Sequence, residues 1–235
     1  MNKPYARNVT LILSYYENQE MLDRQLRFIE AMKPRVKERL TLIVVDDGSP
    51  TKKAEDVYRN PDIREARLYR MKVDIPWNQD ACRNLAMRES PNEWALMTDM
   101  DHLVPEQTME WCMNAELREL VAYKFSRVSA PDMEPYKPHP NSWLISKTLY
   151  DKFDGYNEQY AGIYGTDGAF ARDLMKHGCI RQSEMPLIRV PREVVADAST
   201  TSLRRRSEWS DLMKEAMKRS RLPRARGIFP WKRLR

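Results

Sequence analysis

Residues 40–49 of the chain read LTLIVVDDGS. Six apolar or β-branched residues in unbroken succession are typical of a strand that is buried on both faces of a sheet. The run ends in two aspartates, a glycine and a serine, which are residue types that favour a turn. We therefore expect a buried strand with two acidic side chains at its carboxyl end.

On both sides of residues 40–49, the sequence alternates between strand and helix patterns. Residues 9–14 form a second apolar run, and between the two runs Leu22, Leu26 and Ile29 recur at helical spacing. A strand, helix, strand unit predicts parallel pairing with a right-handed crossover. The remaining predicted strands are 66–73, 94–98, 120–128 and 141–146, and the remaining predicted helices are 79–88, 107–117, 147–153 and 169–177, the last one capped by Gly178. Residues 129–140 contain four prolines and are predicted to form a surface loop.

Composition indicates a folded protein of 235 residues, because 42% of them are hydrophobic and 31% charged. The apolar runs are far shorter than the ~20 residues of a membrane-spanning helix, so we expect no transmembrane segment. The basic start is followed by too short an apolar run for a secretion signal, which predicts a cytoplasmic location. Three cysteines, Cys82, Cys112 and Cys179, are far apart and odd in number, which favours reduced thiols.

Positive charge is concentrated at the C-terminus. Residues 203–235 hold twelve Lys and Arg against three Asp and Glu, a balance of +9, so the first 202 residues carry −3 of the total of +6. Within this part, residues 209–217 have apolar side chains at helical spacing, which predicts a helical basic extension. Such a segment favours polyanions, and the candidate partners are DNA and an anionic membrane surface, with plain solubility as the alternative.

Three acidic clusters follow predicted secondary structure: Asp46 with Asp47, Asp99 with Asp101, and Asp167. In an open parallel sheet, ligands bind outside the carboxyl ends of the strands, so the first two clusters should meet at one crevice. There a carboxylate can hold a divalent cation, Mn²⁺ or Mg²⁺, while diphosphate oxygens complete its coordination. The alternative is a set of exposed acidic turns.

Four ordered motifs together resemble the GT-A fold glycosyltransferases, especially the family 2 type, over about residues 9–178. They are SYYEN at 14–18, VDDGS at 45–49, ACRN at 81–84 and the Asp-x-Asp motif DMD at 99–101. In the second half, FDGYNE at 153–158 and YGTDGAFAR at 164–172 are similar to segments of family 2 and galactosyltransferase-like enzymes. The resemblance implies an α/β, Rossmann-like, mostly parallel sheet flanked by helices.

The resemblance also implies roles for individual residues. Those expected at a nucleotide-sugar donor, most simply a UDP-sugar, are Ser14, Tyr15, Tyr16, Glu17, Asp46, Asp47, Arg83 and Asp99. Asp101 is the expected metal ligand, with Asp99 and His102 as further candidates. Those expected at the acceptor are Trp143, Tyr164, Gly165 and Thr166, and Asp167 is the expected catalytic base. Core packing of one tyrosine, a surface ion pair of Arg83 and an N-cap role of Asp167 are the alternatives.

These inferences predict an inverting, metal-dependent glycosyltransferase domain at 1–202, with a nucleotide-sugar half at about 1–128 and an acceptor half at about 129–202, followed by the basic extension at 203–235. The acceptor hydroxyl could belong to a hydroxymethylated base in DNA, which the loop at 129–140 would help to enclose after base flipping. It could instead belong to a saccharide or lipid-linked glycan at a membrane, with residues 229–231 as an interfacial wedge. A non-catalytic protein that binds nucleotide-sugars or nucleic acid is the alternative of another class.

Overall fold

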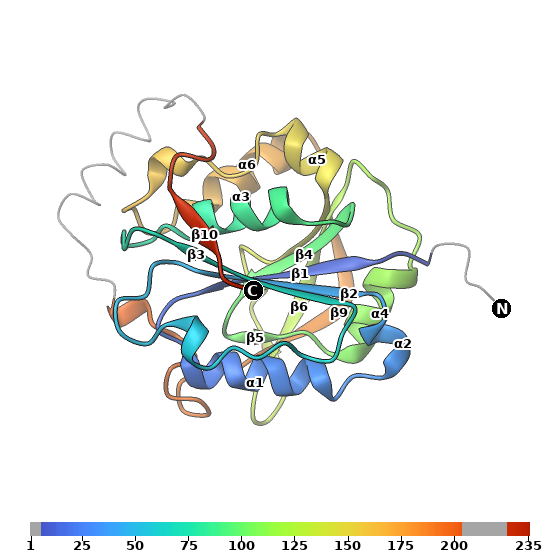
Figure 1. Ribbon diagram of the computed structural model, residues 1–235. Coiled ribbons are helices and arrows are strands. Elements are labelled where there is room, and N and C mark those ends of the chain that lie inside the picture. Colours follow the sequence, from blue (N-terminus) through green and yellow to red (C-terminus); the bar gives the residue numbers. More distant parts are fainter. Residues whose placement is uncertain (1–5, 204–224) are drawn as a thin grey trace.

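A computed structural model describes residues 6–203 and 225–235 of the chain. Within them, ten strands form a single sheet with helices on both faces (Figure 1). The strands are β1 (Val9–Tyr15), β2 (Leu40–Asp46), β3 (Glu65–Met71), β4 (Trp94–Asp99), β5 (His102–Leu103), β6 (Ala122–Ser129), β7 (Glu134–Tyr136), β8 (Trp143–Ser146), β9 (Ile180–Arg189) and β10 (Trp231–Arg233). Their order is β10-β3-β2-β1-β4-β8-β6-β9-β5, with β7 paired to β6.

The centre of the sheet is parallel. Strand β1 pairs in parallel with β2 on one side and with β4 on the other, and β2 pairs in parallel with β3. Strand β8 runs antiparallel to β4, and β6 and β9 pair in parallel with each other. The strand order therefore reverses between β1 and β4, which places a topological switch point at their carboxyl ends.

Two hydrophobic clusters sandwich the sheet. The helices are α1 (Gln19–Glu30), α2 (Pro34–Lys37), α3 (Gln79–Glu89), α4 (Glu106–Asn114), α5 (Lys147–Lys152) and α6 (Asp167–Lys176), with short 3₁₀ turns η1 (Ala54–Asp56), η2 (Glu158–Tyr160) and η3 (Thr201–Leu203). Helices α1, α2 and α4 cover one face, whereas α3, α5 and α6 cover the other (Figure 1). Alternate residues of β2 enter opposite clusters, which explains why this strand reads as a continuous apolar run.

The predicted strands and helices of residues 9–178 are confirmed, with ends that move by a few residues. Proline content misled the prediction at 129–140, because the exposed residues Glu134–Tyr136 form β7 against β6. Among the described strands, β7 pairs only with β6, so it is an edge strand, in which Pro135 is tolerated. The expected helix around 209–217 lies outside the described residues.

The final residues of the chain complete the sheet. Strand β10 pairs antiparallel with β3, and Phe229 and Trp231 pack against the cluster beneath α3. The ring of Trp231 meets that of Tyr69 edge-on at 5.6 Å, and the Arg88 guanidinium lies 5.1 Å from its centroid. Both rings keep part of their surface exposed, so the expectation that residues 229–231 form a membrane wedge stays a prediction.

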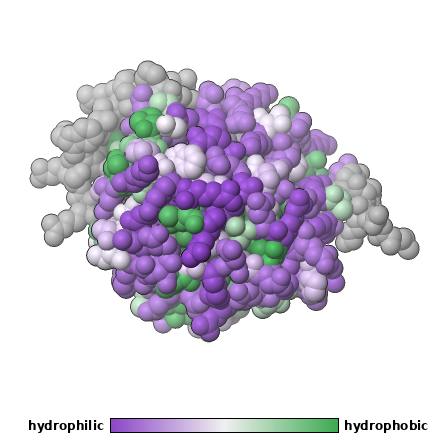
Figure 2. All heavy atoms as spheres, in the orientation of Figure 1, coloured by the Kyte–Doolittle hydropathy of each residue, from purple (hydrophilic) through white to green (hydrophobic). Residues whose placement is uncertain are grey.

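The molecular surface is mostly hydrophilic on the face shown in Figure 2, with hydrophobic residues in small separate areas. Among the described residues, no helix has the length and hydrophobicity needed to cross a bilayer.

Candidate functional site

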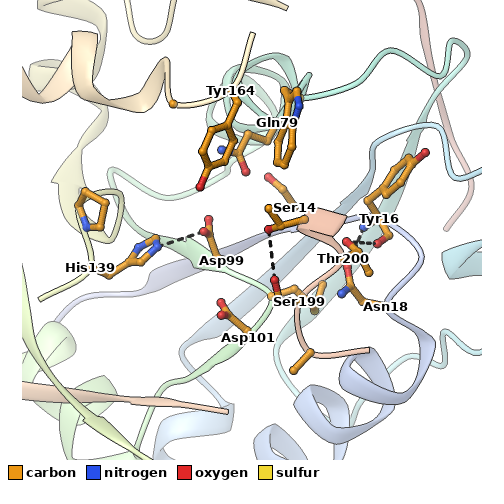
Figure 3. Close-up of a pocket in the computed structure, with 16 residues that line it drawn as sticks. Ser14, Tyr16, Asn18, Gln79, Asp99, Asp101, His139, Tyr164, Ser199 and Thr200 are labelled. Atoms are coloured by element: carbon orange, nitrogen blue, oxygen red, sulfur yellow. Dashed lines mark hydrogen bonds and ion pairs between the residues drawn. The ribbon is translucent and has the colours of Figure 1, made fainter. Parts of the chain in front are cut away.

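A cleft of about 390 Å³ opens at the switch point between β1 and β4 (Figure 3). Ser14 of β1 and Asp99 of β4 both line it, and they are direct partners in the register of these two strands. The other walls come from the start of α3, the loop before β8, the loop before α6 and residues 198–201. Segments between residues 14 and 201 thus converge on the edge where a parallel sheet binds ligands.

Two carboxylates face this cleft. The Asp99 and Asp101 side chains retain 30% and 22% exposure. Asp99 accepts a hydrogen bond from Arg83 Nη2, and its Oδ2 lies 3.1 Å from His139 Nε2. Burial opposes ionisation of Asp99, but the nearby His139 and Arg83 outweigh it and hold the pKa of this carboxyl below its ordinary value.

Behind Asp101 lies a buried histidine. His102 is fully buried, with Nδ1 2.7 Å from Asp101 Oδ1 and Nε2 2.9 Å from Arg127 Nη1. Because a guanidinium can only donate, Nε2 accepts this hydrogen bond and the ring proton is assigned to Nδ1, toward Asp101. The histidine that lines the cleft is instead His139, whose ring is tilted by 48° against that of His102 with centroids 4.5 Å apart. Sequence reasoning gave His139 no role, because its loop position carried no signal.

The carboxylate pair fits a divalent cation. Carboxylate oxygens are the ligands that Mn²⁺ and Mg²⁺ prefer, and both aspartates keep part of their surface open to the cleft. Within residues 6–203 and 225–235, no group of three His, Cys, Asp or Glu side chains forms a metal site. A cation bound here would need further oxygen ligands from a substrate or water.

Arg83 lies behind Asp99 and is not itself among the residues that line the cleft. It lies on α3, is fully buried and stacks over the ring of Tyr156 with 5.4 Å to the centroid. Its pairing with Asp99 shows that the expected alternative of a surface ion pair does not describe this residue. A guanidinium in this position offers a fork of donors next to the carboxylates.

The opposite end of the cleft is formed by Tyr16, Asn18 and residues 198–201 (Figure 3). Tyr16 Oη donates to Asp74 Oδ1 at 3.1 Å, and its carbonyl accepts from Thr200 Oγ1 at 2.9 Å. Asp197 holds this segment in place, because its carboxylate accepts from the amides of Glu20 and Met21 at the start of α1. Residues 198–201 were missed by sequence analysis, since no motif marks them and only the tertiary fold brings them to β1.

Three residues expected at the donor, Tyr15, Glu17 and Asp46, are bound within the fold. Tyr15 is buried in the core and donates to the Lys52 carbonyl, because it points to the face of β1 opposite Ser14 and Tyr16. Glu17 is buried and accepts from the amides of Thr51 and Lys52 at 3.0 Å.

The acidic pair after β2 is buried as well. Asp46 accepts from the Ser49 and Ala54 amides and from Arg70 Nη1, all within 3.0 Å. Asp47 is fully buried at the carboxyl end of β2 and is not among the residues that line the cleft. The Asp46 carboxylate therefore binds the loop that follows the strand, whereas the donor role expected of Asp47 stays a prediction.

The acceptor predictions divide in the same way. Tyr164 and Gly165 line the cleft, and the Tyr164 ring packs on Trp77 with centroids 4.5 Å apart. Thr166 instead donates to Asp80 Oδ2 at 2.8 Å, which joins the start of α6 to α3. Trp143 is a fully buried core residue of β8. Asp167 is the first residue of α6, directly after this cleft-lining loop; its side chain lies outside the described part of the structure.

Comparison with solved structures decides the fold. The mannosyltransferase PcManGT from Pyrobaculum calidifontis, in complex with GDP-Man and Mn²⁺, aligns over 94% of this chain and 67% of its own, with a TM-score of 0.64 and 16% identity. This chain has the GT-A fold. TarS 1–349 from S. aureus aligns over 81% of the present chain and 63% of its own (TM-score 0.62, 13% identity), and GalNAc-T7 with UDP, GalNAc and Mn²⁺ over 80% and 44% (TM-score 0.61, 9% identity). This GT-A chain therefore spans less than two thirds of TarS 1–349. No protein-family model and no curated protein matches it.

Proposed function

We propose that the chain is a metal-dependent glycosyltransferase that moves a sugar from a nucleotide-sugar to an acceptor hydroxyl. The observation that carries this proposal is the Asp99–Asp101 pair, open to a cleft at the switch point of a GT-A fold. Structural neighbours of the same fold support it, since their complexes contain UDP-GlcNAc, GDP-Man, or UDP with GalNAc.

The cleft suggests a division of labour for the donor. Asp101 would hold the divalent cation, which neutralises charge on the leaving diphosphate, and Asp99 would contact the ribose or a metal-bound water. Arg83 would donate to the diphosphate, exchanging part of its contact with Asp99. Tyr16, at the far end of the cleft, would stack on a base, for which we propose uracil.

The acceptor hydroxyl would approach from the side of Tyr164 and Gly165. We propose inverting transfer with Asp167 as the base: its carboxylate takes the hydroxyl proton while the oxygen attacks the anomeric carbon. The bond from that carbon to the diphosphate oxygen breaks, and the nucleoside diphosphate leaves. Asp167→Asn should then retain donor binding and lower the transfer rate about 10²–10⁴-fold, as expected for a removed general base.

Titration calorimetry with UDP and Mn²⁺, followed by incubation with UDP-sugars, tests the enzyme proposal. We expect saturable UDP binding and slow donor hydrolysis. If the protein neither binds UDP nor hydrolyses any nucleotide-sugar, the enzyme proposal fails. Binding without hydrolysis or transfer would support the alternative of a non-catalytic protein that binds nucleotide-sugars.

For the acceptor, we propose a hydroxymethylated base in duplex DNA, on the strength of the +9 balance of residues 203–235. Retention on duplex DNA should fall steeply with salt, because neutralised phosphates release counterions. Retention that hardly depends on salt would favour a saccharide or lipid-linked glycan, which mass spectrometry of glycosylated products would then identify.

A further inference from the structure

Glu158 joins the end of the chain to the body of the domain. Its carboxylate is 2% exposed and accepts from the amides of Gly227 and Ile228, both at 2.8 Å. Its own amide donates to the Ala225 carbonyl at 3.0 Å. A buried carboxylate requires such donors, so the C-terminal segment, residues 225–235, is bound here as well as through the pairing of β10 with β3.

The same carboxylate contacts α3. Asn84 Nδ2 donates to Glu158 Oε1 at 2.9 Å and to the Tyr156 carbonyl at 2.8 Å. Asn84 Oδ1 accepts from the Tyr156 amide at 3.1 Å and from Tyr150 Oη. The carboxamide thus makes four hydrogen bonds, which is its full capacity and fixes how α3 is rotated against residues 150–158.

The close approach of these segments depends on Gly155. A Cβ at this position would lie 2.7 Å from Asn84 Oδ1 and 2.4 Å from a ring carbon of Tyr150, and its φ is +55°. Both the contact and the backbone conformation exclude other residues without a shift of the structure.

Arg83, the residue before Asn84, depends on the same partners. Its guanidinium stacks on the ring of Tyr156, the residue whose backbone holds the Asn84 side chain. A change in the rotation of α3 at Asn84 would therefore move Arg83 relative to both Tyr156 and Asp99.

We propose that Glu158 is a positioning residue for donor binding: by joining the C-terminal segment to Asn84, it holds Arg83 where the diphosphate of the donor binds. This inference rests on the proposed function, and it makes the last residues of the chain part of the donor site although they lie outside the cleft.

Glu158→Gln tests this with little change of shape. The new amide group must face Asn84, Gly227 or Ile228, all of which are donors, so one hydrogen bond becomes a contact between two donors. We expect the variant to fold and its Kd for UDP with Mn²⁺ to rise about tenfold. Titration calorimetry on the full chain measures the change, with circular dichroism to show that the fold is kept.

A double-mutant cycle with Arg83→Gln separates positioning from general destabilisation. If Glu158 acts through Arg83, Glu158→Gln should raise the Kd by less than about twofold once Arg83 has been replaced. The same tenfold loss in both backgrounds would overturn the proposal.

Asp151→Asn is the matched control. Asp151 Oδ1 lies 3.0 Å from Arg226 Nη2 and so also binds the C-terminal segment, but its side chain is 52% exposed and it makes no contact with Asn84. Its Kd for UDP should stay within about twofold of the wild type. An equal loss in this variant would show that any loosening of the segment weakens binding, and would overturn the role of Glu158.

Two remaining outcomes are distinguishable. If the wild type binds no UDP, the proposed function is refuted. If the wild type and Glu158→Gln bind UDP with the same Kd, only this inference is refuted. Should Glu158→Gln not fold, Tyr150→Phe replaces it, because it removes one hydrogen bond from Asn84 Oδ1. We then expect a Kd about threefold higher, and an unchanged Kd would refute the positioning role.

Discussion

Acidic residues follow strands β2 and β4 of the same sheet, yet Asp46 has surroundings opposite to those of Asp99 and Asp101. Asp46, at the end of β2, is fully buried and bound by the Ser49 and Ala54 amides and by Arg70. Asp99 and Asp101, at the end of β4, keep part of their surface open to the cleft. Their partners are side chains that reach in from α3 and from the loop before β8, together with the neighbouring His102.

These different contacts indicate different roles for the VDDGS and DMD motifs. A carboxylate saturated by amides of its own loop stabilises a turn, whereas one held by side chains can exchange those contacts for a ligand. Asp46 in the VDDGS motif shows the first case. Gly48 of this motif has a φ of +76°, and a Cβ on it would clash with the Val73 carbonyl oxygen at 2.2 Å. The VDDGS motif builds the fold, and the DMD motif supplies the chemistry of the proposed site.

The largest effect should come from Asp101→Ala. Loss of the proposed metal ligand should weaken UDP binding in the presence of Mn²⁺ at least ~100-fold, because the diphosphate then lacks its counter-charge. Calorimetry of the wild type with EDTA should give the same weak binding, while the variant should not respond to EDTA. Metal-dependent binding that survives in the variant would contradict the contrast between the two motifs.

Much of this fold could be predicted from the sequence, because continuous apolar runs and helical spacings follow from burial on a parallel sheet. β9 and β10 were missed, since Ile180–Arg189 holds the polar run Arg181–Glu184 and neither alternates nor forms a continuous apolar run, and Trp231–Arg233 lies in a basic stretch. Trp231–Arg233 forms a strand because it pairs with the open edge of β3, which lies far away in the sequence.

The candidate site was only partly predictable for the same reason. A motif tells which residues lie at a strand end, but not which side they face. Tyr15 and Tyr16 are neighbours with opposite environments, and Glu17 binds the loop after β2. His139 and residues 198–201 reach the cleft through tertiary packing alone, and no local pattern marks them.

Asp46→Asn should affect stability and spare donor binding. Replacing the carboxylate removes the buried charge that pairs with Arg70 and sets an amide group against the amides of Ser49 or Ala54. We expect the free energy of unfolding to fall by about 3 kcal/mol, as for other broken buried pairs. Urea denaturation measures this, and the folded variant should keep the wild-type Kd for UDP. Weaker UDP binding at full stability would place Asp46 in the donor site after all.

The two adjacent tyrosines provide a smaller test. Tyr16→Ala should raise the Kd for UDP about tenfold, since a base stacked on an aromatic ring contributes ~1–3 kcal/mol. Tyr15→Phe should leave the Kd unchanged and lower the free energy of unfolding by ~1 kcal/mol through the lost bond to Lys52. The reverse pattern would mean that the strand presents its other face to the donor.

The smallest effect is a pair of opposite pH dependences in metal-free protein. Burial raises the pKa of Asp46 despite its amide donors, so its contribution to stability is full below the unfolded value of about 4 and is lost as pH rises through the raised pKa. The pKa of Asp99 is lowered, so its contribution is present above about pH 4 and is lost as pH falls through the lowered pKa. The stability difference between wild type and Asp46→Asn should therefore grow on acidification, while that between wild type and Asp99→Asn should shrink. Urea denaturation between about pH 3 and 7 measures both, and two slopes of the same sign would mean that the two aspartates share one kind of environment.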